Sequence, residues 1–201
     1  MVRKMLIDEV AICNMALANV GETPIQSLTE KRKQATICNQ RYDEARLEAL
    51  SGALWAFASM WQSGVAISAD PKPGWSYVHK YPNDALRVFE IYQADLTAPP
   101  IPFEVTDAAT GGGKWIHSNE ESPTFVYTRD KEDVTSFDWQ FIEALSWLLA
   151  FKISMPLTKS KTMADRCEKA WIQRRGDAKA RTKNEQYVDR DQLAPHHAAR
   201  F

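Results

Sequence analysis

Cysteine, histidine and glycine are scarce in this sequence. The 201 residues contain three cysteines, four histidines and eight glycines. The cysteines, Cys13, Cys38 and Cys167, are odd in number and far apart, which excludes a disulfide scaffold, and no Cys-x-x-Cys pair indicates zinc. All three lie among apolar residues of predicted helices, so we expect buried thiols. We predict neither a metal site nor a cofactor.

Long apolar runs and an excess of one charge are also missing. The 25 basic and 26 acidic residues nearly cancel, which argues against a protein that coats nucleic acid with its whole surface. The longest apolar run, about residues 144–154, is interrupted by Lys152 and falls short of the ~18 residues of a membrane span. The N-terminus lacks the apolar stretch of a secretory signal. We expect a protein made and kept in a cytosol, without a membrane span.

Four stretches have helical periodicity. The first is followed by Gly21, and the second presents a narrow face of small residues that permits close helix packing. We expect the third to end at Pro156 and the fourth to be capped by Thr158 or Ser160. The periodic positions are Val10, Cys13, Leu17 and Val20; Ala35, Cys38, Tyr42, Ala45 and Ala49; Phe141, Leu145 and Leu148; and Met163, Cys167, Ala170 and Trp171.

The middle of the chain is rich in β-branched and aromatic residues separated by proline and glycine. We predict strands over 86–92, 101–105, 114–116 and 124–128, with a hairpin at glycines 111–113. Residues 70–74, with two prolines and a glycine, are expected to form a loop. After Arg174 the apolar pattern fades, which predicts an exposed helix that becomes a tail.

The sequence therefore predicts an α+β protein. We expect mainly an α-helical bundle with an inserted small antiparallel β-sheet and an extended C-terminal helix and tail. Residues 1–60 and 138–175 would form the helical bundle core, residues 61–137 an aromatic loop and β-rich insertion, and residues 176–201 a basic C-terminal extension. Residues 159–201 carry a net charge of +5 and the rest of the chain −6, so a basic appendage is attached to an acidic body.

No motif for catalysis is present, and we predict that the protein is not an enzyme. The run at residues 108–115 resembles a phosphate-binding loop but lacks its first glycine and final Ser or Thr, so a hairpin loop is favoured. His196 and His197 lack helical metal-site spacing, and His79 and His117 stand alone. Glu120 and Glu121 have no visible partner for acid or base catalysis.

Two groups of residues are candidates for contacts with partners. The basic group could lie on a solvated helix exterior, dock onto an acidic protein surface or bind nucleic acid. The aromatic group fits a core or a subunit interface better than a base-stacking surface, because only Lys72 and Lys80 lie nearby. The basic group is Arg174, Arg175, Lys179, Arg181 and Lys183; the aromatic group is Trp55, Phe57, Trp61, Trp75, Tyr77 and Tyr81.

Four blocks of residues follow one another along the chain. The first runs from Cys13-Asn14 to Gly21 with Ile25 and Ser27, and the second from Cys38 through Tyr42-Asp43 and Arg46 to Leu50 and Trp55-Ala-Phe57-Ala58. The third is Pro73-Gly74-Trp75-Ser-Tyr77 with Tyr81-Pro82-Asn-Asp84 and Arg87-Val88. The fourth runs from Phe137-Asp138 through Phe141, Ala144, Leu145 and Ala150 to Met155-Pro156-Leu157-Thr158. In their order and spacing these blocks resemble the tail tubular protein A family of tailed-phage head-to-tail adaptors.

This resemblance implies a structural virion protein made in the host cytoplasm. It would be one subunit of a ring, a dodecamer when assembled, that attaches beneath the portal and contacts the next tail or nozzle protein. DNA would pass through the ring without specific binding during ejection, since an acidic channel removes the counterion-release gain. The residues alone leave two other functions open: a nucleic-acid-binding module that uses the basic C-terminal helix, and a virion-associated hydrolase that depends on Glu120 or Glu121.

Overall fold

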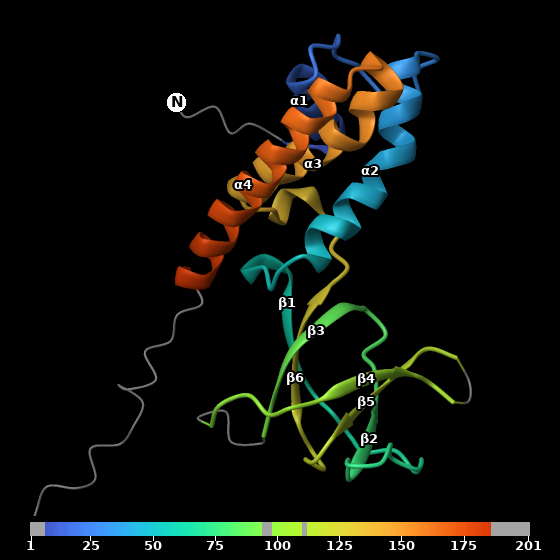
Figure 1. Ribbon diagram of the computed structural model, residues 1–201, viewed down its shortest axis with the longest axis vertical. Helices are drawn as coiled ribbons and strands as arrows, with labels where there is room; N and C mark the ends of the chain where they lie inside the picture. Colours follow the sequence, from blue (N-terminus) through green and yellow to red (C-terminus); the bar gives the residue numbers. More distant parts are fainter. Residues whose placement is uncertain (1–6, 94–97, 110–111, 186–201) are drawn as a thin grey trace, which may run out of the picture. The chain divides into compact units, whose positions relative to one another are not determined.

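The computed structural model describes residues 7–93, 98–109 and 112–185 and has an α+β fold (Figure 1). Its helices are α1 (Glu9–Asn19), α2 (Lys33–Ser51), α3 (Trp139–Thr158) and α4 (Lys161–Glu185), with short 3-10 turns at Ala56–Ala58 and Val134–Ser136. The strands are β1 (Ser59–Ser63), β2 (Tyr77–Lys80), β3 (Ala85–Tyr92), β4 (Glu104–Asp107), β5 (Lys114–Ser118) and β6 (Thr124–Arg129). The chain divides into a helical unit, up to Ala58 plus Asp130–Asn184, and a β unit, Ser59–Arg129.

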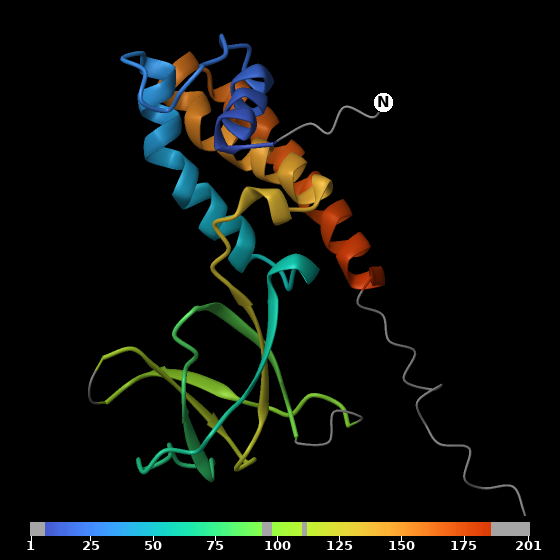
Figure 2. The same cartoon turned by 180° about the vertical axis from the view of Figure 1, so that it is seen from behind.

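In the helical unit, α3 packs against both α1 and α2 (Figures 1 and 2). The small buried residues of α2, among them Ala35, Ala45 and Ala49, allow this close approach, as their spacing predicted. At the solvent edge of the α2–α3 contact, Lys152 bonds to Glu44 (2.9 Å) and Glu48 (2.7 Å). Burial opposes the charge of Lys152, but the two carboxylates outweigh it and raise the pKa of the ammonium group.

A cluster of aromatic rings fills the helical unit beside α3. Trp55 and Phe141 are fully buried and meet edge to face with 4.9 Å between ring centroids. Phe57 and Phe137 each lie 5.0 Å from the Phe141 ring. The Trp55 indole N–H donates to the Ala49 carbonyl at the end of α2 (2.9 Å), so the ring also fixes the chain where it leaves that helix.

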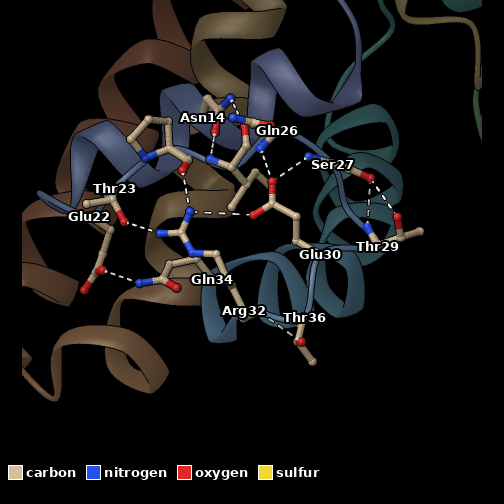
Figure 3. A network of polar contacts seen from close by, with 12 residues as sticks. Asn14, Glu22, Thr23, Gln26, Ser27, Thr29, Glu30, Arg32, Gln34 and Thr36 are labelled. Carbon is tan, nitrogen blue, oxygen red and sulfur yellow. Dashed lines mark hydrogen bonds and ion pairs between the residues drawn. The ribbon is translucent and has the colours of Figure 1, made fainter.

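The connection between α1 and α2 is held by a polar network (Figure 3). Asn14 on α1 bonds to both backbone groups of Ile25: its amide donates to the carbonyl (2.9 Å) and its oxygen accepts the N–H (2.8 Å). The Glu30 carboxylate accepts the N–H groups of Gln26 (2.5 Å) and Ser27 (3.1 Å). Arg32 donates to the Pro24 carbonyl (3.0 Å). A connection that carries few apolar residues is thus ordered by local hydrogen bonds.

Helix α3 is longer than the sequence predicts. Pro156 lies inside it, and the helix continues to Thr158 and ends at Lys159, which has φ 53°. The expected stop at Pro156 is therefore wrong, because proline in the last turn removes one N–H donor without preventing two further helical residues. By length and composition alone this 20-residue helix could cross a membrane, and 56% of its most apolar window is buried within the structure. A core helix of a globular protein meets the same criteria.

The β unit contains two three-stranded antiparallel sheets, in the orders β1-β6-β3 and β2-β5-β4. The predicted strand at 86–92 and those at 114–116 and 124–128 are confirmed, and β4 begins three residues later than the predicted 101–105 strand. The hairpin is also present, since Asp107 pairs with Lys114 across the turn. The prediction of a single sheet is wrong: β1 and β2 lie in the stretch interpreted as an aromatic loop.

Hydrogen bonds join the two sheets at both sides, which makes the β unit resemble a small barrel. The Ile101 N–H, just before β4, donates to the Ile91 carbonyl of β3 (2.7 Å). The Ile67 N–H, just after β1, donates to the Val78 carbonyl of β2 (2.8 Å). The sheets enclose one interior, formed by Val88, Ile91, Ile116, Phe125 and Tyr127. The edges left open by each sheet alone are thus partly covered.

Candidate docking surface

Helix α4 carries the predicted basic group and begins at Ser160, whose hydroxyl accepts the Met163 N–H (3.2 Å). Its buried stripe is Ala164, Cys167, Trp171, Ala178 and Thr182. After Arg174 the helix is mostly exposed, as predicted, but Ala178 (2% exposed) and Thr182 (5%) are buried and continue the stripe. Because the side chains at these positions are small, α4 can pack closely there. Looking in the sequence for large apolar residues does not identify such positions.

Four of the five basic residues flank this stripe, two on each side. Arg174 and Arg181 are seven residues apart on one flank, while Arg175 and Lys179 are four apart on the other. Arg174 is paired with Glu143 of α3 (3.2 Å), and the Arg175 guanidinium lies 5.2 Å from the centre of the Trp171 ring. Lys179 and Arg181 also have interaction partners. Lys183 belongs to α4, but its side chain lies outside the described part.

A row of apolar side chains runs along α3 at steps of four or eight residues. Trp139 is 48% exposed and Met155 is 49% exposed, and Trp147 and Phe151 between them are half-buried. Each step of four residues turns by about 40° around the helix, so this apolar row winds around α3, and Glu143, which is paired with Arg174 of α4, lies between Trp139 and Trp147. The sequence prediction treated this helix as central and did not single out the row. The sequence signal that could have identified these residues is their repeat at steps of four, next to the buried positions of the helix.

The six predicted aromatic residues do not form one surface. Trp55 and Phe57 belong to the helical unit, and the other four belong to the β unit. Trp61 is 53% exposed and stacks on Tyr92 with 5.5 Å between ring centroids. Trp75 and Tyr77 are half-buried, and the Tyr81 hydroxyl accepts the Val88 N–H (3.0 Å). Most of the group is therefore core or half-buried packing.

The titratable groups considered for catalysis have structural partners. Nε2 of the buried His79 lies 3.0 Å from the Ser118 hydroxyl and 3.1 Å from the Glu120 carbonyl. Burial lowers the pKa of His79 from its ordinary value and so favours the neutral ring. Glu121 is exposed, and His196 and His197 lie outside the described residues. Over residues 7–93, 98–109 and 112–185, no group of three or more His, Cys, Asp or Glu could hold a metal ion.

The predicted buried thiols are confirmed: Cys13, Cys38 and Cys167 are free and fully buried. Burial and the contact with Cys38 raise the pKa of the Cys13 thiol, so it is a poor nucleophile.

No protein-family model matches this chain, and a search of curated proteins finds no match. The geometry defines an α+β protein whose exposed features include the apolar side chains Trp139 and Met155 of α3 and the basic residues of α4.

Proposed function

We propose that this chain is a ring-forming subunit of a head-to-tail adaptor in a tailed-phage virion. The observation that carries the proposal is that two large apolar side chains of α3, Trp139 and Met155, are about half exposed, because a ring subunit needs exposed apolar area that neighbouring copies can bury. In the proposal the helical unit is the bundle that forms the ring, and α4 is the extended C-terminal helix that contacts the portal.

The resemblance blocks support this proposal through the fold. Asn14 and Ile25 of the first block are hydrogen-bonded to each other, and Arg46 and Trp55 of the second fix the ends of the helical unit. Asp84 of the third block accepts the Tyr127 hydroxyl (2.9 Å). Burial and Asp84 raise the Tyr127 pKa to about 12, so this bond persists at neutral pH. The residues of these blocks thus hold the fold of this chain together.

Removing the apolar row is expected to weaken ring assembly. Because burying a large apolar side chain contributes about 1.5–3 kcal/mol, Trp139→Ser or Met155→Ser should weaken the contact between copies by about tenfold to a hundredfold. Electron microscopy of the purified protein, with and without the portal protein of the same genome, would count closed rings. Ile172→Ser is the control, since Ile172 on α4 is 54% exposed and outside the row. Equal loss of rings in the control would contradict the proposal.

Neutralising part of the basic group is expected to reduce binding to the portal. The triple variant Arg174→Gln, Lys179→Gln, Arg181→Gln removes three charges and leaves Arg175 stacked on Trp171. The lost Arg174–Glu143 pair is surface-exposed and contributes less than about 1 kcal/mol, so folding should be kept. Lys161→Gln, Arg166→Gln, Lys169→Gln is the matched control on the same helix. Sedimentation with the portal should separate the two variants by about tenfold in affinity.

The same variants test the nucleic-acid-binding alternative. A helix that binds phosphates would lose DNA affinity in the triple variant, and its salt dependence would fall by a slope of about three. The adaptor proposal expects unchanged, weak duplex-DNA binding by the assembled ring at low salt, because the body of the chain is acidic. Tight DNA binding by the ring would contradict it.

A further inference from the structure

Two strands of the β unit have a backbone edge that no other strand of the described ranges covers. β1 pairs with β6 on one side, and β4 pairs with β5 on one side. Each is joined to its other neighbour only through residues outside the strand itself. Ile67, after β1, bonds to Val78 of β2, and Ile101, before β4, bonds to Ile91 of β3. Along their own lengths, β1 and β4 therefore each present a free edge.

The register of β1 shows which backbone groups point to its free edge. The Gly64 N–H donates to the Pro123 carbonyl (2.6 Å), and this pair continues the register of β1 with β6. In an antiparallel ladder, hydrogen-bonded and non-hydrogen-bonded residue pairs alternate. Trp61 and Ser63 therefore belong to non-hydrogen-bonded pairs, and their N–H and C=O groups point away from β6. Both residues are exposed, Trp61 by 53%.

The free edge of β4 has the same construction. The Ala108 N–H donates to the Gly113 carbonyl (3.0 Å), and this pair continues the register of β4 with β5. By the same alternation, the N–H and C=O groups of Val105 and Asp107 point away from β5. Val105 is 38% exposed and Asp107 is also exposed. Each edge thus offers backbone donors and acceptors from two residues, one of them apolar on β4 and one aromatic on β1.

The edge of β1 lacks the features that keep exposed sheet edges from pairing. Proteins protect such edges with charged side chains, especially lysine, or with proline. Residues 49–69, which include all of β1, contain no charged residue and no proline. β4 carries two carboxylates, but Glu104 is paired with Lys72, and Asp107 lies opposite Lys114 on β5. An uncharged edge can therefore pair with the β4 edge without repulsion between like charges.

The two free edges lie at different junctions between the sheets, β1 at the junction with β2 and β4 at the junction with β3. We propose that β1 of one copy pairs with β4 of the next copy, so that backbone hydrogen bonds connect the β units around the ring. Because the two edges are different surfaces, each copy has one edge for each neighbour, and the contact repeats head to tail until the ring closes. This inference rests on the proposed ring function and adds a second contact to that of the helical unit.

Cysteine cross-linking of assembled rings tests the pairing. Ser63→Cys and Asp107→Cys are combined in one chain, and rings formed with the portal protein of the same genome are treated with a short bifunctional maleimide. The native cysteines are buried, so the unmodified chain gives the background reaction. Copies joined from β1 to β4 should give a ladder of covalent oligomers after denaturation, and each single variant should stay monomeric. Dimers from Ser63→Cys alone would show that β1 pairs with β1, which would overturn the proposal.

Proline at the outward-pointing positions tests the backbone contact itself. Ser63→Pro and Asp107→Pro each remove one N–H at the free edge and none that bonds within the sheet, a position where proline is tolerated. Each should raise the protein concentration needed for ring formation about tenfold, because one backbone hydrogen bond between copies is lost. Ser63→Thr keeps the N–H and is the control. Circular dichroism of the free chain should be the same in all three variants.

The failure of this inference can be told apart from the failure of the adaptor proposal. If rings form but the double cysteine variant gives no ladder, and Ser63→Pro assembles as readily as Ser63→Thr, the strand pairing is overturned while the adaptor proposal stands. If the unmodified chain forms no ring, alone or with the portal protein, both are overturned.

Discussion

Gly64→Ala is expected to destabilise the β unit by about 3 kcal/mol, because no space exists for a methyl group. Gly64 lies just after β1, where the chain turns from one sheet toward the other, and its N–H donates to the Pro123 carbonyl (2.6 Å). An added Cβ would be 2.6 Å from Cε2 of Phe125 and 3.1 Å from Cε1. Phe125 is 1% exposed and meets His79 edge to face at 5.7 Å, so its ring cannot move aside.

A double-mutant cycle gives this prediction a specific test. Phe125→Leu removes the ring atoms that an alanine at position 64 would meet, so Gly64→Ala should cost much less in that background, with coupling of at least about 1 kcal/mol. Gly176→Ala is the control glycine, because no atom lies within 4 Å of its added Cβ and alanine favours a helix. Urea unfolding of the unmodified chain and the three variants of the cycle measures the coupling. Additive effects would show that steric conflict with Phe125 is not the cause.

The helices could be predicted from the sequence because their periodicity is strong and local. The step of three and four residues at Ala35, Cys38 and Tyr42 identified the buried face of α2, and all three side chains are buried. The end of α3 could not be predicted in the same way. Pro156 disfavours helix on average, but in the last turn it removes only one N–H donor, and the Thr158 hydroxyl and the Lys159 N–H still donate to the Ser154 (2.8 Å) and Met155 (3.1 Å) carbonyls.

The sheets were less predictable because strand partners are far apart in sequence. β1 pairs with β6, about 65 residues away, and its sequence Ser-Met-Trp-Gln-Ser has no clear alternation of large apolar residues. The closure of the two sheets depends on Ile67 and Ile101, which lie outside any strand. Gly64 gives no sequence signal for the same reason: its requirement comes from Phe125, which is 61 positions later.

The candidate sites also differ in how much of each could be predicted from the sequence. The basic residues of α4 could be predicted by counting charges along the sequence. Their positions on two flanks of a buried stripe could not, because these depend on how the helix packs. His117 carried no motif, and only its register opposite Glu104 brings it to Lys72.

Arg46→Met is expected to destabilise the helical unit by about 2 kcal/mol, because it removes a buried donor of charge-assisted hydrogen bonds, although its partners Asp130 (37% exposed) and Asp43 (76% exposed) stay accessible to water. Arg46 on α2 has a side chain only 5% exposed and pairs with Asp130 and Asp43. It also donates to the Lys131 carbonyl (2.9 Å), so it holds the chain where it re-enters the helical unit after β6. Methionine keeps the apolar stem but leaves Asp130 and the Lys131 carbonyl without this donor.

Arg41→Met on the same helix is the matched control. Arg41 is paired with Glu44 at 2.8 Å, but both side chains are about half exposed, so its loss should cost less than about 1 kcal/mol. Arg46→Lys keeps the charge but not the planar group that reaches Asp130, Asp43 and the carbonyl together, and should fall between the two. Thermal unfolding monitored by far-ultraviolet circular dichroism ranks the three variants. If Arg46→Met and Arg41→Met are equally mild, Arg46 does not anchor this segment, and its place in the second resemblance block has another cause.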